Sequence, residues 1–135
     1  MREIVLVGLG GLLGSILRFA LGTWVQQLNR DASFPYATLL INVAGCTIIG
    51  ILAGLTEFRG PFSSAAKAFL FIGLLGGFTT YSAFGLETWQ LLEAGRARIA
   101  LLSVLLQVGL GISAVWFGVR VARMSWPVVR ARFPG

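Results

Sequence analysis

The fold is decided by the stretch Gly73-Leu74-Leu75-Gly76-Gly77-Phe78-Thr79-Thr80-Tyr81-Ser82-Ala83-Phe84. It lies near the middle of an apolar segment, 64–93, that would be roughly 45 Å long as one helix at about 1.5 Å per residue. A bilayer core is only about 30 Å thick. Paired glycines followed by two β-branched threonines form a poor helix interior, so we expect a break here. Broken backbone at membrane depth needs protein or a water-filled cavity beside it, and therefore indicates an ion-binding site.

Three further apolar runs lie outward from this segment, at 4–25, 36–55 and 99–119. Each is close to the length of about 20 residues that a transmembrane helix needs. Pro35 suits the start of the second helix, where its missing N–H is not needed. The four spans use nearly all of the 135 residues and leave no room for a soluble domain. We therefore predict an all-α integral membrane protein, a single domain of four transmembrane helices with the third broken near its middle.

The composition agrees with this prediction and excludes several classes of function. Hydrophobic residues make up 56% of the chain and charged residues 12%, and the mean hydropathy is +0.84. The net charge is +6, but the basic residues flank the apolar runs and would meet lipid headgroups there, so we expect no nucleic-acid partner. With no His and a single cysteine, Cys46, a zinc site and a His-based catalytic triad are excluded. The run 4–25 is too long for the core of a signal peptide and is interpreted as the first span.

The first two spans carry small and polar residues on defined faces. Gly10 and Gly14 form a GxxxG pair, which lets helix backbones approach closely. Arg18, several residues inside the first span, faces either an aqueous vestibule, where it would attract an anion, or the nearer interface. Thr38 and Asn42 share one face of the second span. The Asn42 amide must find partners, either on a neighbouring helix or, through its N–H donors, in an anion.

The other two spans extend this polar pattern. Tyr81 and Phe84 are i, i+3 neighbours just after the expected break, and their ring edges carry partial positive charge. Ser82, like both threonines of the break, adds a hydroxyl, and Glu87 lies toward the end of the span. Ser103 and Gln107, at i, i+4 on the fourth span, line a passage or bond to a neighbouring helix. Together these residues describe a narrow polar track.

The order and spacing of three stretches make the chain resemble a known family. These stretches are Gly10-Gly11-Leu12-Leu13-Gly14-Ser15-Ile16-Leu17-Arg18-Phe19, Thr38-Leu39-Leu40-Ile41-Asn42-Val43-Ala44-Gly45 and Gly76-Gly77-Phe78-Thr79-Thr80-Tyr81-Ser82-Ala83-Phe84. Along nearly its whole length the chain resembles the Fluc (CrcB) family of microbial fluoride ion channels. The resemblance implies passive fluoride export from the cytoplasm through a multi-pass protein of the cell (inner or plasma) membrane.

The resemblance also implies an assembly and a set of site residues. It implies an antiparallel, dual-topology dimer in the lipid bilayer, with two fluoride pores and a structural sodium ion at its centre. The sodium ligands would be the backbone carbonyls of Gly76 and Thr79. The implied pore residues are Asn42 as an amide donor, Tyr81 and Phe84 as aromatics, Ser82 and Thr38 on the polar track, Arg18 at the entrance and Glu87 at the pore mouth.

The chain departs from the family pattern at several positions. Tyr81 stands where the family usually has phenylalanine, which adds a hydroxyl to the pore. Ala83 replaces a common hydroxyl residue, which shortens or reroutes the polar track. Ala37 and Cys46 replace a glycine and a serine on the second span, where we expect them to affect packing.

The distribution of basic residues bears on the orientation of the chain in the membrane. One side is expected to hold seven, which include a basic tail after the fourth span: Arg2, Arg59, Lys67, Arg120, Arg123, Arg130 and Arg132. The opposite side holds Arg30, Arg96 and Arg98. This bias favours a cytoplasmic N-terminus, whereas a dual-topology homodimer needs near balance. Either the homodimer tolerates the bias or the chain pairs with an oppositely oriented homologue, and we favour the homodimer.

Three other classes of protein remain as alternatives. A proton-coupled exporter of the small multidrug-resistance type needs a carboxylate embedded in the membrane, whereas the glutamates here lie toward span ends. A non-transporting membrane subunit would not need the glycine- and threonine-rich break. An intramembrane enzyme would need a nucleophile and a base, and Cys46 has no His partner.

Overall fold

The secondary-structure elements of the described residues are all helices, as predicted. The structure is a computed structural model that describes residues 1–29, 34–59 and 62–132, with the side chains of 58–59 and 125–132 left out. Its elements are α1 (Arg2–Leu28), α2 (Tyr36–Arg59), α3 (Ser64–Lys67), the π-helical segment η1 (Ala68–Leu75), α4 (Gly76–Phe78), α5 (Tyr81–Glu93) and α6 (Ala97–Arg132).

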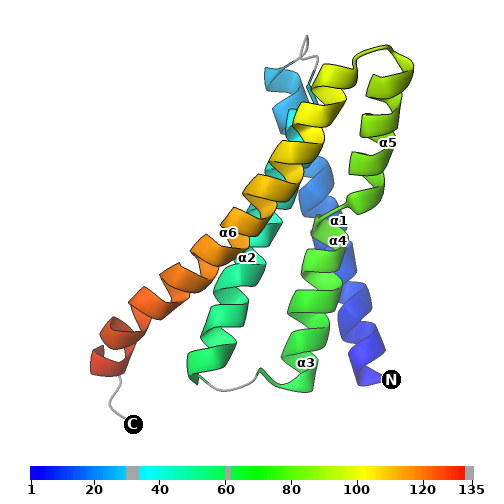
Figure 1. The fold of residues 1–135 in the computed structure, drawn as a ribbon. Helices are drawn as coiled ribbons and strands as arrows, with labels where there is room; N and C mark the ends of the chain where they lie inside the picture. The colour runs from blue at the N-terminus through cyan, green and yellow to red at the C-terminus, as the bar shows by residue number, and fades with distance from the viewer. Residues whose placement is uncertain (30–33, 60–61, 133–135) are drawn as a thin grey trace.

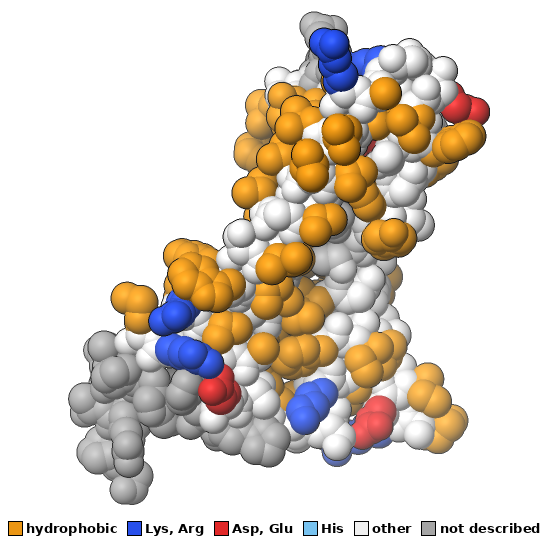
Figure 2. Space-filling view, viewed as in Figure 1, with side chains coloured by type: hydrophobic (Ala, Val, Ile, Leu, Met, Phe, Trp, Pro, Cys, Tyr) orange, Lys and Arg blue, Asp and Glu red, His pale blue; other side chains and the backbone are white. Residues whose placement is uncertain are grey.

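Four helices are long and apolar enough to cross a membrane. They are Arg2–Leu28, Tyr36–Glu57, Ser64–Glu93 and Ala97–Met124. Within the most apolar window of each, only 11% to 28% of the residues are buried by the rest of the chain. Apolar side chains cover the middle of the molecule, and charged side chains gather toward its two ends (Figure 2). A surface this apolar is stable only in a lipid environment, so the four predicted spans are confirmed.

The four spans pack as two pairs. α1 lies along η1 and α4, while α2 lies along α6, and α5 leans on α6 above the break (Figure 1). The C-terminal end of α1, the N-terminal end of α2 and the 93–97 turn lie at one end of the molecule (Figure 1). The N-terminus, the C-terminal end of α2, the start of α3 and the C-terminal end of α6 lie at the opposite end. Both α1, which also contacts α2, and the third span, through α5 on α6, therefore link the two pairs.

The residues predicted as a basic tail after the fourth span continue α6 as a helix through Arg132. The added turns give the basic residues partners: the Arg123 guanidinium donates to the Glu57 carboxylate at 3.1 Å. The Arg120 guanidinium lies 5.2 Å from the centre of the Trp116 ring. Of the other residues used to predict orientation, Arg30 and the side chains of Arg59, Arg130 and Arg132 lie outside the described residues.

The break in the third span is confirmed, but the glycines do not cause it. Gly76 and Gly77 are helical, and the chain becomes extended only at Thr79 (φ −83°, ψ 159°) and Thr80 (φ −150°, ψ 119°). The glycines instead permit close packing on α1, because a Cβ on Gly77 would lie 2.6 Å from the Gly11 carbonyl oxygen. Gly10 and Gly14 are buried on the same seam, as the GxxxG pair predicts.

Candidate functional site

The Asn42 side chain is bonded to the extended backbone at the break. Its Oδ1 accepts the Thr80 N–H at 2.9 Å, and its Nδ2 donates to the Thr80 carbonyl oxygen at 3.0 Å. The same Nδ2 donates its second hydrogen to Gln107 Oε1 at 3.2 Å. The amide thus satisfies two backbone groups that the broken helix leaves without partners, which is the requirement for irregular backbone at membrane depth. The predicted role of Asn42 as a donor to an anion stays a prediction.

The face of α2 that carries Asn42 follows the third span on both sides of the break. One turn toward its N-terminus, the buried Thr38 hydroxyl donates to Glu87 Oε1 at 2.6 Å. Close to one turn in the other direction, Gly45 packs against the Thr79 side chain. Thr38, Asn42 and Gly45 therefore contact Glu87 of α5, Thr80 and Thr79 in that order along α2. Glu87, for which the family resemblance implies a place at the pore mouth, is bonded to this face through Thr38.

The hydroxyls of the break cap the two half-helices. Both the Thr79 N–H and the Thr79 hydroxyl donate to the Leu75 carbonyl, at 2.9 and 2.8 Å. Thr80 Oγ1 accepts the Ala83 N–H at 3.2 Å and so caps α5. The Ser82 hydroxyl lies 3.2 Å from Thr80 Oγ1, next to the break as predicted. These caps explain how two threonines end one helix and start the next.

The two aromatic residues after the break are in edge-to-face contact. The ring centres of Tyr81 and Phe84 lie 5.6 Å apart with the ring planes at 62°. Together with Asn42, Thr80 and Gln107 they line a cavity of about 320 Å³ beside the break. Tyr81 is 84% exposed, so most of its ring points away from the rest of the chain.

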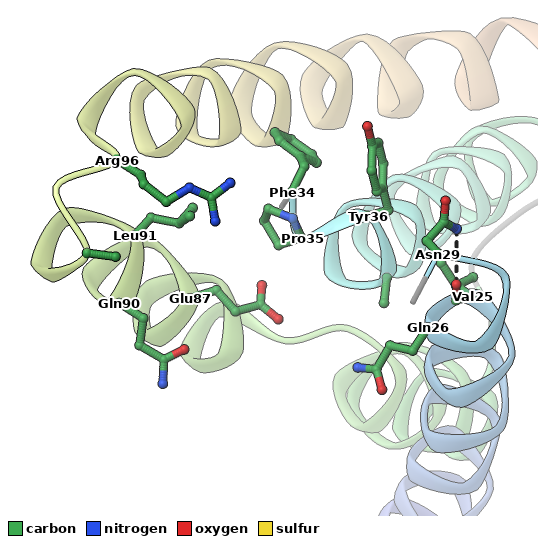
Figure 3. A pocket seen from close by; sticks show the side chains of 12 residues that line it. Val25, Gln26, Asn29, Phe34, Pro35, Tyr36, Glu87, Gln90, Leu91 and Arg96 are labelled. Carbon is green, nitrogen blue, oxygen red and sulfur yellow. Dashed lines mark hydrogen bonds between the residues drawn. The ribbon is translucent and has the colours of Figure 1, made fainter. Parts of the chain in front are cut away.

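A larger cavity of about 530 Å³ opens at the end of the molecule that carries the 93–97 turn. Figure 3 shows the Glu87 carboxylate and the Arg96 guanidinium pointing into it. The amides of Gln26 and Gln90 add polar groups to its wall, beside aromatic rings. A wide polar cavity of this kind is suited to hydrated ions. We call it the vestibule.

The family resemblance predicts Arg18 at an entrance to the pore. It is half-buried on α1 and lines neither the vestibule nor the cavity beside the break. The two predicted sodium ligands, in contrast, lie at the break. A helical Gly76 carbonyl would normally accept the Thr80 N–H, which here donates to Asn42. A Cβ on Gly76 would meet nothing within 4 Å, so this face of α4 is open.

Sequence reasoning missed a set of buried polar atoms near this site. Among the described residues, three such side-chain atoms have no hydrogen-bond partner: Glu87 Oε2, Ser103 Oγ and Gln107 Nε2. The contact between Gln107 and Asn42 was also missed. The i, i+4 spacing of Ser103 and Gln107 was the available signal, but it did not say which helix they face.

These features define a class of protein. Four apolar helices, an interrupted third span, a cavity beside the interruption and a polar vestibule at one end of the molecule are those of a multi-pass membrane protein with an ion pathway, located in bacteria in the inner membrane. Residues 5–119 match the family model described as CrcB-like protein, Camphor Resistance (CrcB). The chain therefore belongs to the CrcB family, as its motifs indicate.

Named relatives support the same assignment. A protein of Methylobacillus flagellatus named fluoride-specific ion channel FluC is 42% identical over 125 residues, which cover 93% of this chain and 98% of the relative. A protein of the same name from Flavobacterium psychrophilum is 44% identical over 123 residues, covering 91% and 98%. Another, from Rhizobium meliloti, is 42% identical over 123 residues with the same coverage. The family is thus one of ion channels and not of enzymes.

Proposed function

We propose that this protein is a passive, fluoride-selective ion channel that exports fluoride from the cytoplasm. The observation that carries the proposal is the break at Thr79–Thr80, bonded to Asn42 and placed beside the ring edges of Tyr81 and Phe84. The names of the relatives support fluoride as the ion. The vestibule supports a route by which a hydrated ion reaches this site.

The chemistry of fluoride suits such a site. Fluoride is small and strongly hydrated, so a selective path must replace the hydrogen bonds of water with donors from the protein. Hydroxyls such as that of Ser82 and positive ring edges supply attraction without a full positive charge, which would hold the ion too tightly. We propose Asn42, Tyr81, Ser82 and Phe84 as the pore lining. Thr38 and Glu87 would lie at its vestibule end, and Arg18 would shape the potential at an entrance.

We further propose the assembly that the family resemblance implies, an antiparallel dimer with two pores. The exposed ring of Tyr81 and the open face at Gly76 support a second copy on this side of the third span. A homodimer is preferred over pairing with an oppositely oriented homologue.

A sodium ion at the centre of that dimer fits the backbone of this chain. Carbonyl oxygens are suitable hard ligands for Na⁺, and the diversion of the Thr80 N–H to Asn42 leaves the Gly76 carbonyl without its usual helical donor. The extended conformation of Thr79 likewise takes its carbonyl out of the helical ladder. The carbonyls of Gly76 and Thr79 would hold the ion, which would supply a fixed positive charge that ties the two broken helices together.

The proposal is tested by fluoride efflux from liposomes reconstituted with this chain alone. With no proton gradient imposed, a channel should release fluoride rapidly and retain chloride, as followed with ion-selective electrodes. Release only when a proton gradient is applied would indicate a coupled exporter. No release from folded protein, by itself or with a homologue of opposite orientation, would contradict the proposed function.

A further inference from the structure

A groove between α1 and α2 opens on the apolar outer surface of the molecule. It has a volume of about 510 Å³. The residues that line it include Leu17, Leu21, Trp24, Ile48, Leu74 and Phe78. Leu17, Trp24 and Ile48 are each about half exposed, so the groove is open on its outer side. We call it the α1–α2 groove.

The α1–α2 groove lies at the depth of the hydrocarbon core. Ile48 is near the middle of α2, and Phe78 directly precedes the break in the middle of the third span. Trp24 lies in the last turns of α1, and tryptophan is enriched where the hydrocarbon meets the lipid headgroups. From Leu17 to Trp24 the groove follows α1 for about 10 Å, at about 1.5 Å per residue. It therefore runs along the helix axis, from near one membrane surface down to the level of the break.

The chemistry of the lining disfavours water and polar ligands. None of the eight lining side chains carries a charge, a hydroxyl, a carboxyl or a carboxamide, and the only polar side-chain group is the indole N–H of Trp24. An apolar space of this kind stays dry, because water finds too few hydrogen-bond partners in it. If the groove were empty, its lining would lose the dispersion contacts that neighbouring atoms supply. The occupant of the groove is therefore apolar.

An acyl chain fits this space better than a helix from a second copy of the protein. A volume of about 510 Å³ over a length of about 10 Å gives a mean cross-section of about 50 Å², whereas a helix about 10–12 Å in diameter needs about 80–110 Å². The groove also lies away from the face proposed for the second copy. Leu74 and Phe78 are i, i+4 neighbours on one side of the third span, and Gly76, halfway between them, points to the opposite side.

We propose that the α1–α2 groove binds one acyl chain of a bilayer phospholipid, which extends along α1 from Trp24 to the level of Phe78. The chain packs behind the break. Leu75, only 4% exposed, lines both this groove and the cavity beside the break, and its carbonyl accepts both donors of Thr79. A bound chain thus supports the residues that end α4 and stabilises the folded state by mass action. The inference concerns lipid binding and does not depend on fluoride conduction.

Retention of dioleoyl phosphatidylcholine by the purified protein tests the proposal. In native mass spectrometry from detergent, the unmodified chain should retain one lipid molecule per chain. Ala20→Phe places a ring in the groove, which Ala20 lines, and should lower the retained fraction at least about fivefold by steric exclusion. Ala53→Phe adds the same ring at an exposed position of α2 outside the groove and is the matched control. No retention by the unmodified chain, or equal retention by folded Ala20→Phe and Ala53→Phe, would overturn the proposal.

Fluorescence quenching locates the acyl chain without filling the groove, and covers the case in which Ala20→Phe fails to fold. The chain has four tryptophans, so Trp24 or Trp116 can be kept as the only one by replacing the other three with Phe. Trp116, 61% exposed on α6, is the matched reporter outside the groove. In detergent, phosphatidylcholine with brominated acyl chains should quench Trp24 saturably, at one lipid per chain, and should not quench Trp116 in this way.

Two results of the quenching experiment would overturn the proposal. One is equal quenching of Trp24 and Trp116, which would indicate unspecific contact with lipid. The other is an unquenched Trp24 together with a shift of Ala20→Phe to a smaller species in size-exclusion chromatography, which would indicate that a second copy of the chain covers the groove.

Discussion

The side-chain amide of Asn42 pairs with the backbone N–H and carbonyl of Thr80, at 2.9 and 3.0 Å, much as a neighbouring β-strand would. A single side chain on α2 thus replaces the helical hydrogen bonds that the third span gives up. The consequence is a break that is stable without glycine at its extended positions. The same pairing fixes the position of α2 along the two helical halves of the third span.

Replacing Asn42 should therefore affect both conduction and stability. Asn42→Ala leaves the Thr80 N–H and carbonyl without partners, and each buried unpaired group costs about 1–3 kcal/mol. We expect a lower midpoint of thermal unfolding in detergent together with loss of fluoride efflux. Asn42→Asp keeps the acceptor for the Thr80 N–H and should recover part of the stability but not the efflux. An Asn42→Ala protein with unchanged unfolding and unchanged efflux would show that the pairing of the Asn42 amide with the Thr80 backbone is dispensable.

Much of the fold follows from the sequence because it depends on local composition. Four apolar runs of membrane length fix the spans, and the two threonines mark the break to within a few residues. The π-helical turns of η1 have no such local signature, because they accompany the close packing of Gly73 and Gly77 on α1. The continuation of α6 beyond position 119 was missed because Arg120 and Arg123 have partners that the sequence does not reveal.

The candidate site residues could be named from the sequence, but their pairings could not. Thr38, Asn42, Glu87, Tyr81 and Phe84 were singled out by spacing, residue type and the family resemblance, and the structure places them along α2 and the third span. Their role as pore residues stays a prediction. Which amide hydrogen meets which acceptor depends on how two distant helices are aligned. The use of Asn42 by Thr80, and the free donor of Gln107, are consequences of that alignment.

The bond between Thr38 and Glu87 should hold the vestibule in shape. Thr38→Val has nearly the same volume but no hydroxyl, so Glu87 Oε1 loses its donor, and Oε2 already has no hydrogen-bond partner among the described residues. A hydrogen bond to a charged group contributes about 1.5–3 kcal/mol, and we expect a loss of stability of that order with slower fluoride efflux. Thr38→Ser keeps the donor and serves as the control. Equal unfolding midpoints and equal efflux for the two variants would argue that the bond has no such role.

The contact between α1 and the third span should not accommodate even one methyl group added at Gly14. In Gly14→Ala the new Cβ would collide with the Leu74 carbonyl and lie 2.8 Å from the Phe78 nitrogen. Overpacking of this kind costs about 1–3 kcal/mol, so the variant should unfold at lower temperature or elute as aggregate in size-exclusion chromatography. Gly8→Ala, on the same helix with nothing within 4 Å, should be neutral or stabilising by up to about 1 kcal/mol. Equal stability of Gly14→Ala and Gly8→Ala would show that α1 and the third span are not closely packed at Gly14.

The hydroxyl of Tyr81 should matter less than its ring. Tyr81→Phe keeps the edge-to-face contact with Phe84 and should retain selective fluoride efflux, with a rate changed by no more than about threefold. Tyr81→Ala removes the ring edge and should lower the efflux at least about tenfold. Efflux and chloride retention are measured in the same liposomes. If Tyr81→Ala conducts like the unmodified protein, the ring is not part of the pore.

Sodium removal offers a test of the proposed metal site that does not need a mutation, since backbone carbonyls have no side chain to replace. A ligand present at about a hundred times its dissociation constant stabilises the folded state by about 2.7 kcal/mol. Unfolding in a sodium-free buffer of equal ionic strength should therefore occur several degrees lower than in sodium, with potassium unable to restore the difference. Asn42→Ala should reduce this sodium-dependent shift, because the Thr80 N–H is then available to bond the Gly76 carbonyl again. Identical midpoints in sodium and potassium would contradict a structural sodium ion at Gly76 and Thr79, while leaving the anion pathway on the other side of the break untouched.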